Sequence, residues 1–261
     1  MKISLNGKKA LVGGSSRGIG FGIARQLAES GASVCLMARN ETKLKLIINE
    51  LPNKHGQKHE YLIVDFLNFE KFKIIINKYV SKNNIDILIN NTQGPPPGNS
   101  LSMNIESYQE AFDLLFKTVV YTSSMAIPNM KKNGWGRIIN VTSVSVKEPL
   151  NYLVLSNSIR ASVVAWAKSL SIDLGPHGIT VNNILTGYFD TERVKELNKE
   201  KSKSLKISEE EVLDKMKSLV PVNRLGKIEE YGYLVSFLSS DKASYINGST
   251  IPIDGGLLKS Y

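Results

Sequence analysis

The chain has 261 residues, of which 42% are hydrophobic, enough for one large α/β domain with a substantial core. No window holds the roughly 18 uninterrupted apolar residues of a membrane helix, and the N-terminal sequence leaves no room for a signal peptide. The single cysteine, Cys35, excludes an internal disulfide, so we expect a cytoplasmic protein. The net charge of +9 favours anionic partners, but the scattered lysines do not indicate nucleic acid.

The stretch 9–27 combines an apolar run, a glycine-rich turn and a helical pattern of apolar residues. This order predicts a strand, a tight turn and a helix. Glycines allow a ligand to approach the backbone closely, and the N-terminus of a helix offers free N–H groups to a phosphate. Taken alone, the turn could also be a purely structural bend.

Six further apolar runs alternate with helical patterns along the chain. Strands are predicted at 10–12, 33–37, 61–64, 85–89, 137–141, 179–184 and 249–253. Helices are predicted at about 19–27, 41–51, 69–80, 105–130, 156–174 and 227–238. This alternation predicts a single Rossmann-type domain over 1–261, with a doubly wound parallel sheet flanked by helices on both faces. The charge-rich segment 188–217 is interpreted as a substrate lid, with capping-box spacing at Ser208–Glu211.

Ligands of such sheets bind at the carboxyl ends of the strands. Several glycine-rich or polar segments follow strands in this sequence and are expected to meet at that edge: 13–20, Asp65, 90–94, 142–145 and 186–191. Their convergence favours a ligand site over a structural bend.

These residues resemble the short-chain dehydrogenase/reductase family over nearly the whole chain. The family's T-G-x-x-x-G-I-G turn corresponds to residues 13–20, with Gly13 in place of threonine. Its N-N-A-G corresponds to 90–93 and departs at the last two positions, and its V-N-x-I-x-P-G-x-x-x-T corresponds to 181–191, with Thr186 in place of proline. The resemblance implies a nicotinamide cofactor and assembly into a homotetramer or a dimer. The cofactor-binding residues that it implies are Gly14, Ser16, Arg17, Gly18, Ile19, Gly20, Arg39, Asp65, Asn91, Arg160, Gly187 and Thr191.

The end of the second strand bears on the choice between NADP(H) and NAD(H). An NAD site places an acid there for the ribose 2′-hydroxyl, whereas an NADP site places arginine near the 2′-phosphate. Here Ala38 takes the place of the acid, and Arg39 follows it. Arg17 can reach the same phosphate, and guanidinium groups suit phosphate well. We therefore predict NADP(H), with NAD(H) less favoured; ordinary surface roles for both arginines are the alternative.

The catalytic positions depart from the family pattern of asparagine, serine, tyrosine and lysine. Ser143 fills the serine position. Ser156 stands where tyrosine is expected and Arg160 where lysine is expected, and Leu115 replaces the asparagine. A serine hydroxyl is far less acidic than a phenol, and arginine keeps its proton. Arg160 can bind the ribose or stabilise an alkoxide, but it cannot replace the missing proton donor.

Three side chains and a bound water are alternative proton donors. Tyr152 lies one turn before Ser156 if the helix starts early, Tyr188 follows the sixth strand, and Lys147 follows Ser143. For each side chain, loop packing or solvent exposure is the competing interpretation. The histidines are poorly placed, metal-ligand spacing is absent, and so is a G-x-S-x-G turn.

Three functions fit these observations. The leading hypothesis is an NADP(H)-dependent oxidoreductase that transfers hydride between nicotinamide and a carbonyl or alcohol substrate, acyl-linked or free. Its scaffold resembles 3-oxoacyl-carrier-protein reductases and alcohol or sugar dehydrogenases. The second is a catalytically degenerate NADP-binding sensor or partner subunit, suggested by the joint loss of tyrosine, lysine and asparagine. The third is a structural protein without a cofactor, which the presence of Arg17, Arg39 and Asp65 disfavours.

Overall fold

A computed structural model describes residues 2–260 and contains one parallel sheet of seven strands. The strands lie in the order β3-β2-β1-β4-β5-β6-β7, so the chain winds outward from β1 in one direction and then from β4 in the other. Their bounds are β1 Lys9–Gly13, β2 Ser33–Ala38, β3 Glu60–Ile63, β4 Ile87–Asn90, β5 Gly136–Val141, β6 Ile179–Thr186 and β7 Thr250–Ile253. The predicted doubly wound fold is therefore confirmed.

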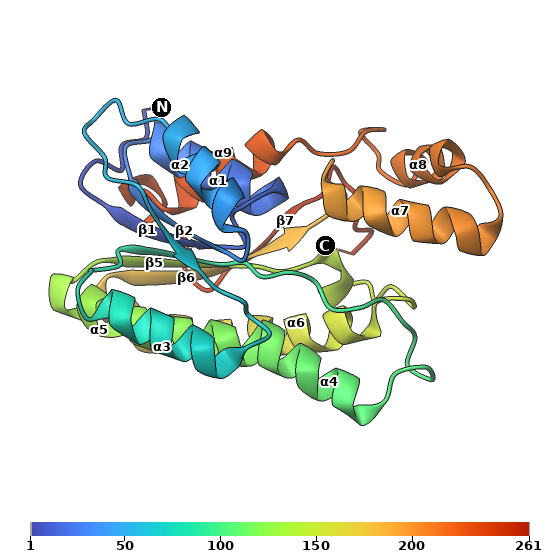
Figure 1. Ribbon diagram of the computed structural model, residues 1–261, viewed down its shortest axis with the longest axis horizontal. Helices are drawn as coiled ribbons and strands as arrows, with labels where there is room; N and C mark the ends of the chain where they lie inside the picture. Colours follow the sequence, from blue (N-terminus) through green and yellow to red (C-terminus); the bar gives the residue numbers. More distant parts are fainter. Residues whose placement is uncertain (1, 261) are drawn as a thin grey trace.

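Helices cover both faces of the sheet (Figure 1). One face carries α1 Gly18–Glu29, α2 Glu41–Glu50 and α9 Ile228–Leu238. The other carries α3 Phe69–Val80, α4 Ile105–Phe112, the π-helical turn η1 Asp113–Lys117, α5 Thr118–Asn133 and α6 Val154–Leu174. Short 3-10 turns occur at η2 Val144–Val146, η3 Gly175–His177 and η4 Asp241–Ala243.

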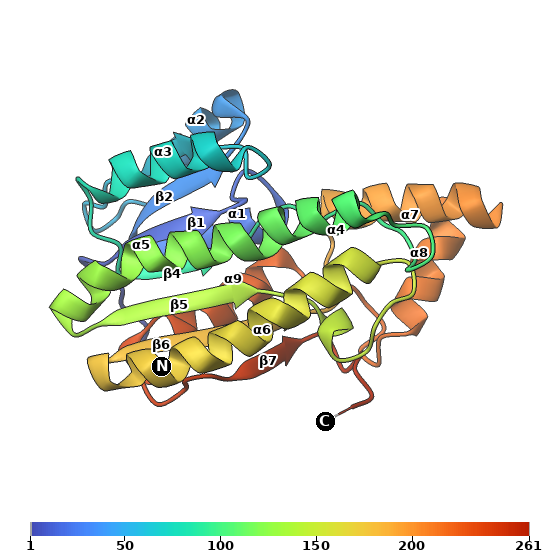
Figure 2. The same cartoon turned by 90° about the horizontal axis from the view of Figure 1, so that it is seen from below.

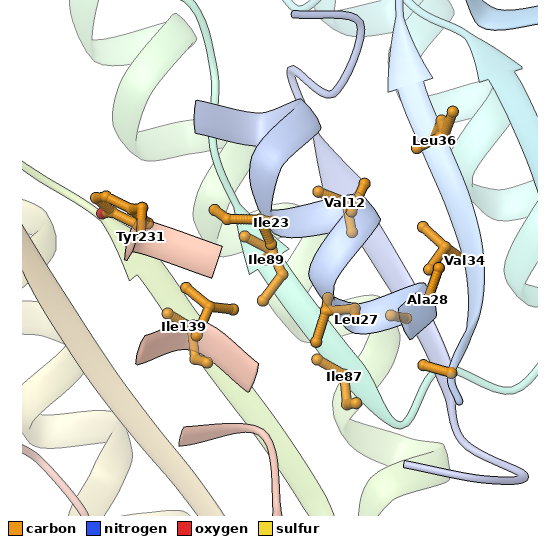
Figure 3. Packing of buried hydrophobic residues seen from close by; sticks show 14 of the residues in the cluster. Val12, Ile23, Leu27, Ala28, Val34, Leu36, Ile87, Ile89, Ile139 and Tyr231 are labelled. Atoms are coloured by element: carbon orange, nitrogen blue, oxygen red, sulfur yellow. The ribbon is translucent and has the colours of Figure 1, made fainter. Parts of the chain in front are cut away.

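Two hydrophobic layers hold these helices on the sheet. Val12 and Ile139 pack against Ile23 of α1 and Tyr231 of α9 on one face (Figure 3). Side chains of neighbouring strand residues alternate between the faces, so the adjacent residues Leu11 and Ile138 belong to the other layer. Both faces of the central strands are thereby buried, which explains their continuous apolar sequences. Cys35 lies in the second layer, as expected for a small buried hydrophobe.

The remaining helices lie beyond the sheet, at the carboxyl ends of the strands. The arrowheads of β5 and β7 in Figure 2 point toward the side where α7 Glu192–Leu205 and α8 Glu209–Ser218 lie. The capping box predicted at the start of α8 is present, because Ser208 and Glu211 exchange hydrogen bonds. Sequence periodicity did not resolve α7, whose polar sequence presents few apolar residues.

The structure corrects several predicted boundaries. Helix α6 begins at Val154 rather than at 156, and β6 extends to Thr186. The predicted helix 105–130 is divided by the π-helical turn and continues to Asn133. Helix ends are weakly marked in sequence, so differences of one or two residues are expected, whereas the range predicted for α3 matches at both ends.

Candidate active site

A cleft of about 1220 Å³ lies at the carboxyl ends of the strands. It is lined by the glycine turn after β1, the loop after β4, the ends of β5 and β6, and the inward side of α7. Residues far apart in the sequence meet here because all strands of the sheet run parallel. Of the predicted site residues, the cleft brings together all except Asp65.

The glycine turn is shaped for close approach of a ligand. Gly14 and Gly18 have φ of +55°, a left-handed conformation that glycine adopts without strain. A Cβ on Gly20 would lie 2.2 Å from the carbonyl oxygen of Gly14, so only glycine fits there. Asn91 donates from Nδ2 to the Gly13 carbonyl at 3.0 Å and fixes the turn from the side of β4.

The first turn of α1 faces this cleft without a side-chain cap. Arg17 occupies the N-cap position, and because a guanidinium can only donate hydrogen bonds, its side chain does not cap the helix. The first N–H groups of α1 have no intrahelical partner, and the helix dipole makes this end electropositive. The turn and helix together therefore fit the phosphates of a dinucleotide.

Arg39 and Lys43 line the end of the cleft beyond the glycine turn. Among residues 2–260, no carboxylate lies within salt-bridge distance of Arg39. Lys43 was missed at the sequence level, because its helix reads as an ordinary polar helix. The two cations supply the positive charge expected for a 2′-phosphate.

Arg17, predicted to bind the same phosphate, contacts the segment of α7 instead. Its Nη1 lies 2.6 Å from Glu192 Oε2 and 3.2 Å from Glu196 Oε1. The hydrogen bond to Glu192 raises the pKa of Arg17, and the same contact lowers the pKa of Glu192. Arg17 thus joins the glycine turn to α7, a contact between distant segments that sequence spacing does not reveal.

Asp65 and Thr191 also have local structural roles. Asp65 is exposed, and its Oδ1 accepts from the backbone N–H of Leu67 at 3.1 Å, while the neighbouring Val64 and Phe66 line the cleft. Its predicted role in binding the cofactor stays a prediction. Thr191 caps the start of α7 by accepting from the Val194 N–H at 3.3 Å.

Ser143, Ser156 and Arg160, the residues at the family's catalytic positions, all line the cleft. Arg160 donates from Nη1 to the Val141 carbonyl at 2.6 Å and from Nε to Ser156 Oγ at 3.2 Å. Burial lowers the pKa of Arg160 to about 10, so the guanidinium remains charged at neutral pH. Ser143 caps the turn η2, and its Oγ accepts from the Ser145 N–H at 3.1 Å.

Leu115, at the position of the family's asparagine, lies in the π-helical turn η1 and is buried. A small void beneath the cleft is lined by Leu115, Arg160 and two asparagines, Asn90 and Asn140. The void thus has polar side chains from β4 and β5 on one side and the apolar Leu115 on the other. Leu115 itself offers no hydrogen bond to a proton relay.

The alternative proton donors differ in position. Tyr152 does not lie on α6, as the early helix start would require; it belongs to the preceding turn, where its carbonyl accepts from the Gly98 N–H at 2.7 Å. It nevertheless lines the cleft, as does Tyr188, whereas Lys147 does not. Burial is the main cause that raises the pKa of both phenols, to about 12 for Tyr188. The neighbouring phenol opposes the increase in pKa for Tyr152 and adds to it for Tyr188.

Helix α7 contributes side chains that sequence analysis did not identify. Arg193, Leu197 and Lys201 line the cleft, and their spacing of four residues places them along one side of the helix. This spacing was the available signal, but the segment was interpreted only as a lid of unspecified structure. Among residues 2–260, no cluster of His, Cys, Asp and Glu could hold a metal ion, and no helix is long and apolar enough to cross a membrane.

Comparison with known proteins identifies the family. The family model described as enoyl-(acyl carrier protein) reductase matches residues 14–258. The chain belongs to the short-chain dehydrogenase/reductase family. It is 33% identical over 257 residues to the NADPH-dependent reductase BacG of Bacillus subtilis, covering 97% of this chain and 98% of that protein. It is 31% identical to the 3-oxoacyl-[acyl-carrier-protein] reductase FabG of Aquifex aeolicus over 258 residues, 98% of this chain and all of that one.

Solved structures of reductases share the whole fold. The L-sorbose reductase of Gluconobacter frateurii, complexed with NADPH and L-sorbose, superposes with a TM-score of 0.92 at 29% identity and full coverage of both chains. YwfH, an NADPH-dependent reductase involved in bacilysin biosynthesis, superposes with a TM-score of 0.91 at 31% identity, covering 97% of this chain and 99% of that one. The predicted membership of the short-chain dehydrogenase/reductase family is confirmed, and with it the oxidoreductase class.

Proposed function

We propose that this short-chain dehydrogenase/reductase is an NADPH-dependent reductase of a small carbonyl compound, with Arg160 as the group that stabilises the developing oxyanion. The observation that carries the proposal is a charged, desolvated guanidinium fixed between Ser156 and the Val141 carbonyl, inside the cleft that the glycine turn shares. The relatives described above, which include NADPH-dependent reductases, support the same cofactor and reaction class.

The residues present fit a nicotinamide dinucleotide phosphate. The glycines of the turn leave room where any Cβ would collide with Gly14 or Asn91, and the uncapped start of α1 would hold the central phosphates. Arg39 and Lys43 would hold the 2′-phosphate. When bound, the nicotinamide supplies the hydride; the chain orients it and excludes water.

Arg160 and the two serines would act on the carbonyl oxygen of the substrate. Ser143 and Ser156 can donate hydrogen bonds from their hydroxyls and orient the carbonyl. As negative charge develops on that oxygen, the fixed charge of Arg160 stabilises it without reorganisation. Because the Arg160 pKa of about 10 exceeds physiological pH, the charge is present throughout the neutral range.

Tyr152 would then protonate the alkoxide. Tyr188 lowers the pKa of Tyr152 against the effect of burial, whereas Tyr152 raises the pKa of Tyr188, so Tyr152 is the phenol of the pair that gives up its proton more readily. Tyr188 would position Tyr152 from the loop after β6. A general acid contributes roughly 10²–10⁴-fold to rate, which is the loss that replacing the usual tyrosine by Ser156 would otherwise impose.

The test is NADPH oxidation measured against a panel of ketones, keto esters and aldehydes, together with a fluorescence titration of NADPH. We expect tight NADPH binding, turnover of at least one class, and a loss of kcat in Tyr152→Phe with NADPH affinity unchanged. Binding without turnover of any substrate would contradict the proposal and return the protein to a sensor or partner role. Unchanged kcat in Tyr152→Phe would remove Tyr152 as the donor.

Reduction of a carbon–carbon double bond conjugated to a carbonyl is a second candidate. Hydride would add to the β carbon, the electron pair would move to the carbonyl oxygen as an enolate held by Arg160, and a proton from solvent or Tyr152 would reach the α carbon. An enolate needs charge stabilisation more than an immediate phenolic proton, which suits an arginine at 160 and a serine at 156. Product analysis with an enone distinguishes the saturated ketone from the allylic alcohol.

Three further features of the protein belong to this proposal. Residues 188–217 would act as a lid over the cleft, which α7 borders. Exposed apolar side chains on the α4 and α6 side, such as Ile105 and Ile172, support assembly into a homotetramer or dimer, which light scattering would measure. A cytoplasmic location, without a nucleic-acid or membrane partner, completes the proposal.

A further inference from the structure

We propose that Arg193 and Lys201 form an anion-binding subsite at the substrate end of the cleft, which selects substrates that carry a carboxylate or phosphate group. The proposal rests on the proposed reductase function and specifies the substrate class. The two residues belong to α7 and line the same cleft as Ser143, Ser156 and Arg160.

The spacing on α7 directs both cations to the cleft. Arg193, Leu197 and Lys201 follow one another at intervals of four residues on a helix of 14 residues, so their side chains share one side. Lys199 and Lys203, which lie between and beyond them on the same helix, do not line the cleft. The helix thus separates its five cations into two that line the cleft, Arg193 and Lys201, and three that do not, Lys195, Lys199 and Lys203.

Arg193 spans the cleft in the present structure. Its Nη2 donates to the carbonyl of Pro95 at 3.3 Å, in the loop after β4. Nη1 lies 3.8 Å from Glu196 Oε2, too far for a hydrogen bond, so that nitrogen is not committed to a short contact with a carboxylate. A guanidinium offers five donors in a planar array, which leaves N–H groups for a planar carboxylate or a phosphate.

Lys201 lies beside the proposed proton donor. Its Nζ is 5.7 Å from the centre of the Tyr152 ring, within the range of a cation–π contact. No carboxylate is within salt-bridge distance of this ammonium group among residues 2–260. An anionic group of the substrate bound by Lys201 would lie close to Tyr152, the proposed proton donor.

The carboxylates on this side of the cleft do not cancel the positive charge. Three carboxylates of α7 line the cleft: Glu192, Glu196 and Glu200. Arg17 of the glycine turn pairs with two of them, Glu192 at 2.6 Å and Glu196 at 3.2 Å. Glu200 is the third. Arg160, Arg193 and Lys201 line the same cleft as Glu200, so three cations stand against this one carboxylate. The balance favours an anion, and Glu200 is the group expected to oppose it.

Carboxylate and phosphate are distinguishable by substrate choice. A free keto acid would bring a carboxylate, whereas a thioester on a phosphopantetheine arm would bring a phosphate. The experiment therefore measures kcat and KM with NADPH for three matched pairs: keto acids against their methyl esters, keto thioesters of phosphopantetheine against those of pantetheine, and enoic keto acids against their esters.

Wild-type protein is expected to show a KM at least about tenfold lower for the charged member of one pair. In Arg193→Gln and Lys201→Gln this preference should fall to within about twofold, through an increased KM for the charged member alone, with kcat for the neutral member and KM for NADPH unchanged. Lys199→Gln and Lys203→Gln, which remove cations that do not line the cleft, should retain the full preference. Glu200→Gln should increase it.

Equal KM values for charged and neutral members in wild type, with turnover present, would overturn the subsite and leave the reductase function standing. The subsite would also be overturned if Lys199→Gln lost the preference for the charged substrate to the same extent as Arg193→Gln. If NADPH binds but no substrate turns over, the reductase proposal fails, and the subsite is tested by thermal stabilisation with acetoacetate and with inorganic phosphate in the presence of NADP⁺. Stabilisation that Arg193→Gln and Lys201→Gln abolish would support it; stabilisation unaffected by both would refute it.

Discussion

The glycine turn and the catalytic centre lie in one cleft but differ in how far they follow the family. At the turn, backbone conformation determines which residues fit: Gly14 and Gly18 adopt positive φ, and Gly20 has no space for a side chain. At the catalytic positions, side-chain chemistry determines the reaction, and there Ser156, Arg160 and Leu115 replace the expected residues. The turn therefore retains its pattern because geometry admits few alternatives.

At the catalytic positions, the residues differ from the family pattern while the surrounding helices and strands are retained. Arg160 occupies the lysine position and still reaches the backbone of β5 and the residue one turn earlier on α6. Leu115 is held within the π-helical turn η1. Binding and reaction are thus carried by separable parts of the cleft, and substitutions should affect one without the other.

The largest separation is expected for Arg160→Gln. Removing the charge that stabilises the oxyanion should lower kcat by roughly 10²–10³-fold, the typical cost of one electrostatic donor in an active site. The NADPH dissociation constant, measured by fluorescence, should change by less than about fivefold. A variant that loses NADPH binding and activity together would show that Arg160 serves the cofactor rather than the reaction.

Gly14→Ala should give the opposite result. A Cβ there would lie 2.8 Å from Asn91 Nδ2, at a residue with φ of +55°, so the turn must shift. We expect NADPH affinity to fall by about tenfold or more, with little change in kcat at saturating NADPH. Gly56→Ala is the control, because that position also has positive φ but has nothing within 4 Å; its NADPH affinity should equal that of wild type.

Arg39→Gln and Arg17→Gln compare two cations at the adenosine end of the cleft. Arg39 has no carboxylate within salt-bridge distance in the described chain, so its removal should weaken NADPH binding by about tenfold and leave NADH unaffected. Arg17 must release Glu192 before it can bind the 2′-phosphate, so Arg17→Gln should weaken NADPH binding by about threefold or less. Titration of both cofactors measures the difference, and equal effects would disprove the distinction.

The smallest effect is expected from pH. A phenol keeps its proton below its pKa, and burial raises the pKa of Tyr152 above its usual value near 10. The Arg160 guanidinium, with a pKa of about 10, is also charged below that pH. The kcat for carbonyl reduction should therefore stay level from pH 6 to about 9 and fall as pH rises through about 10. A decline near pH 7 would implicate a different donor.

Local sequence patterns predicted the fold well because they have local causes. Helix α3 matches its predicted range because Asn68 caps its start by accepting from the Lys71 N–H, and its apolar residues recur on one side. Predicted site residues that follow a strand line the cleft, as Ser143 does, with Asp65 as the exception. Failures came from long-range contacts: Arg17 meets Glu192 across the cleft, and Tyr152 is held by the Gly98 N–H rather than by a helix.

The asparagine side chains at the ends of the strands add a second set of cross-strand bonds beside the backbone ladder. Asn90 donates to Asn140 at 2.8 Å, Asn140 donates to Asn183 at 2.9 Å, and Asn183 reaches Thr250 at 3.4 Å, so β4 to β7 are joined in one line beneath the cleft. Hydrogen exchange should therefore be slowest in this part of the sheet. We therefore expect any opening that admits a substrate in the loop after β4 and in α7, above this cross-linked floor.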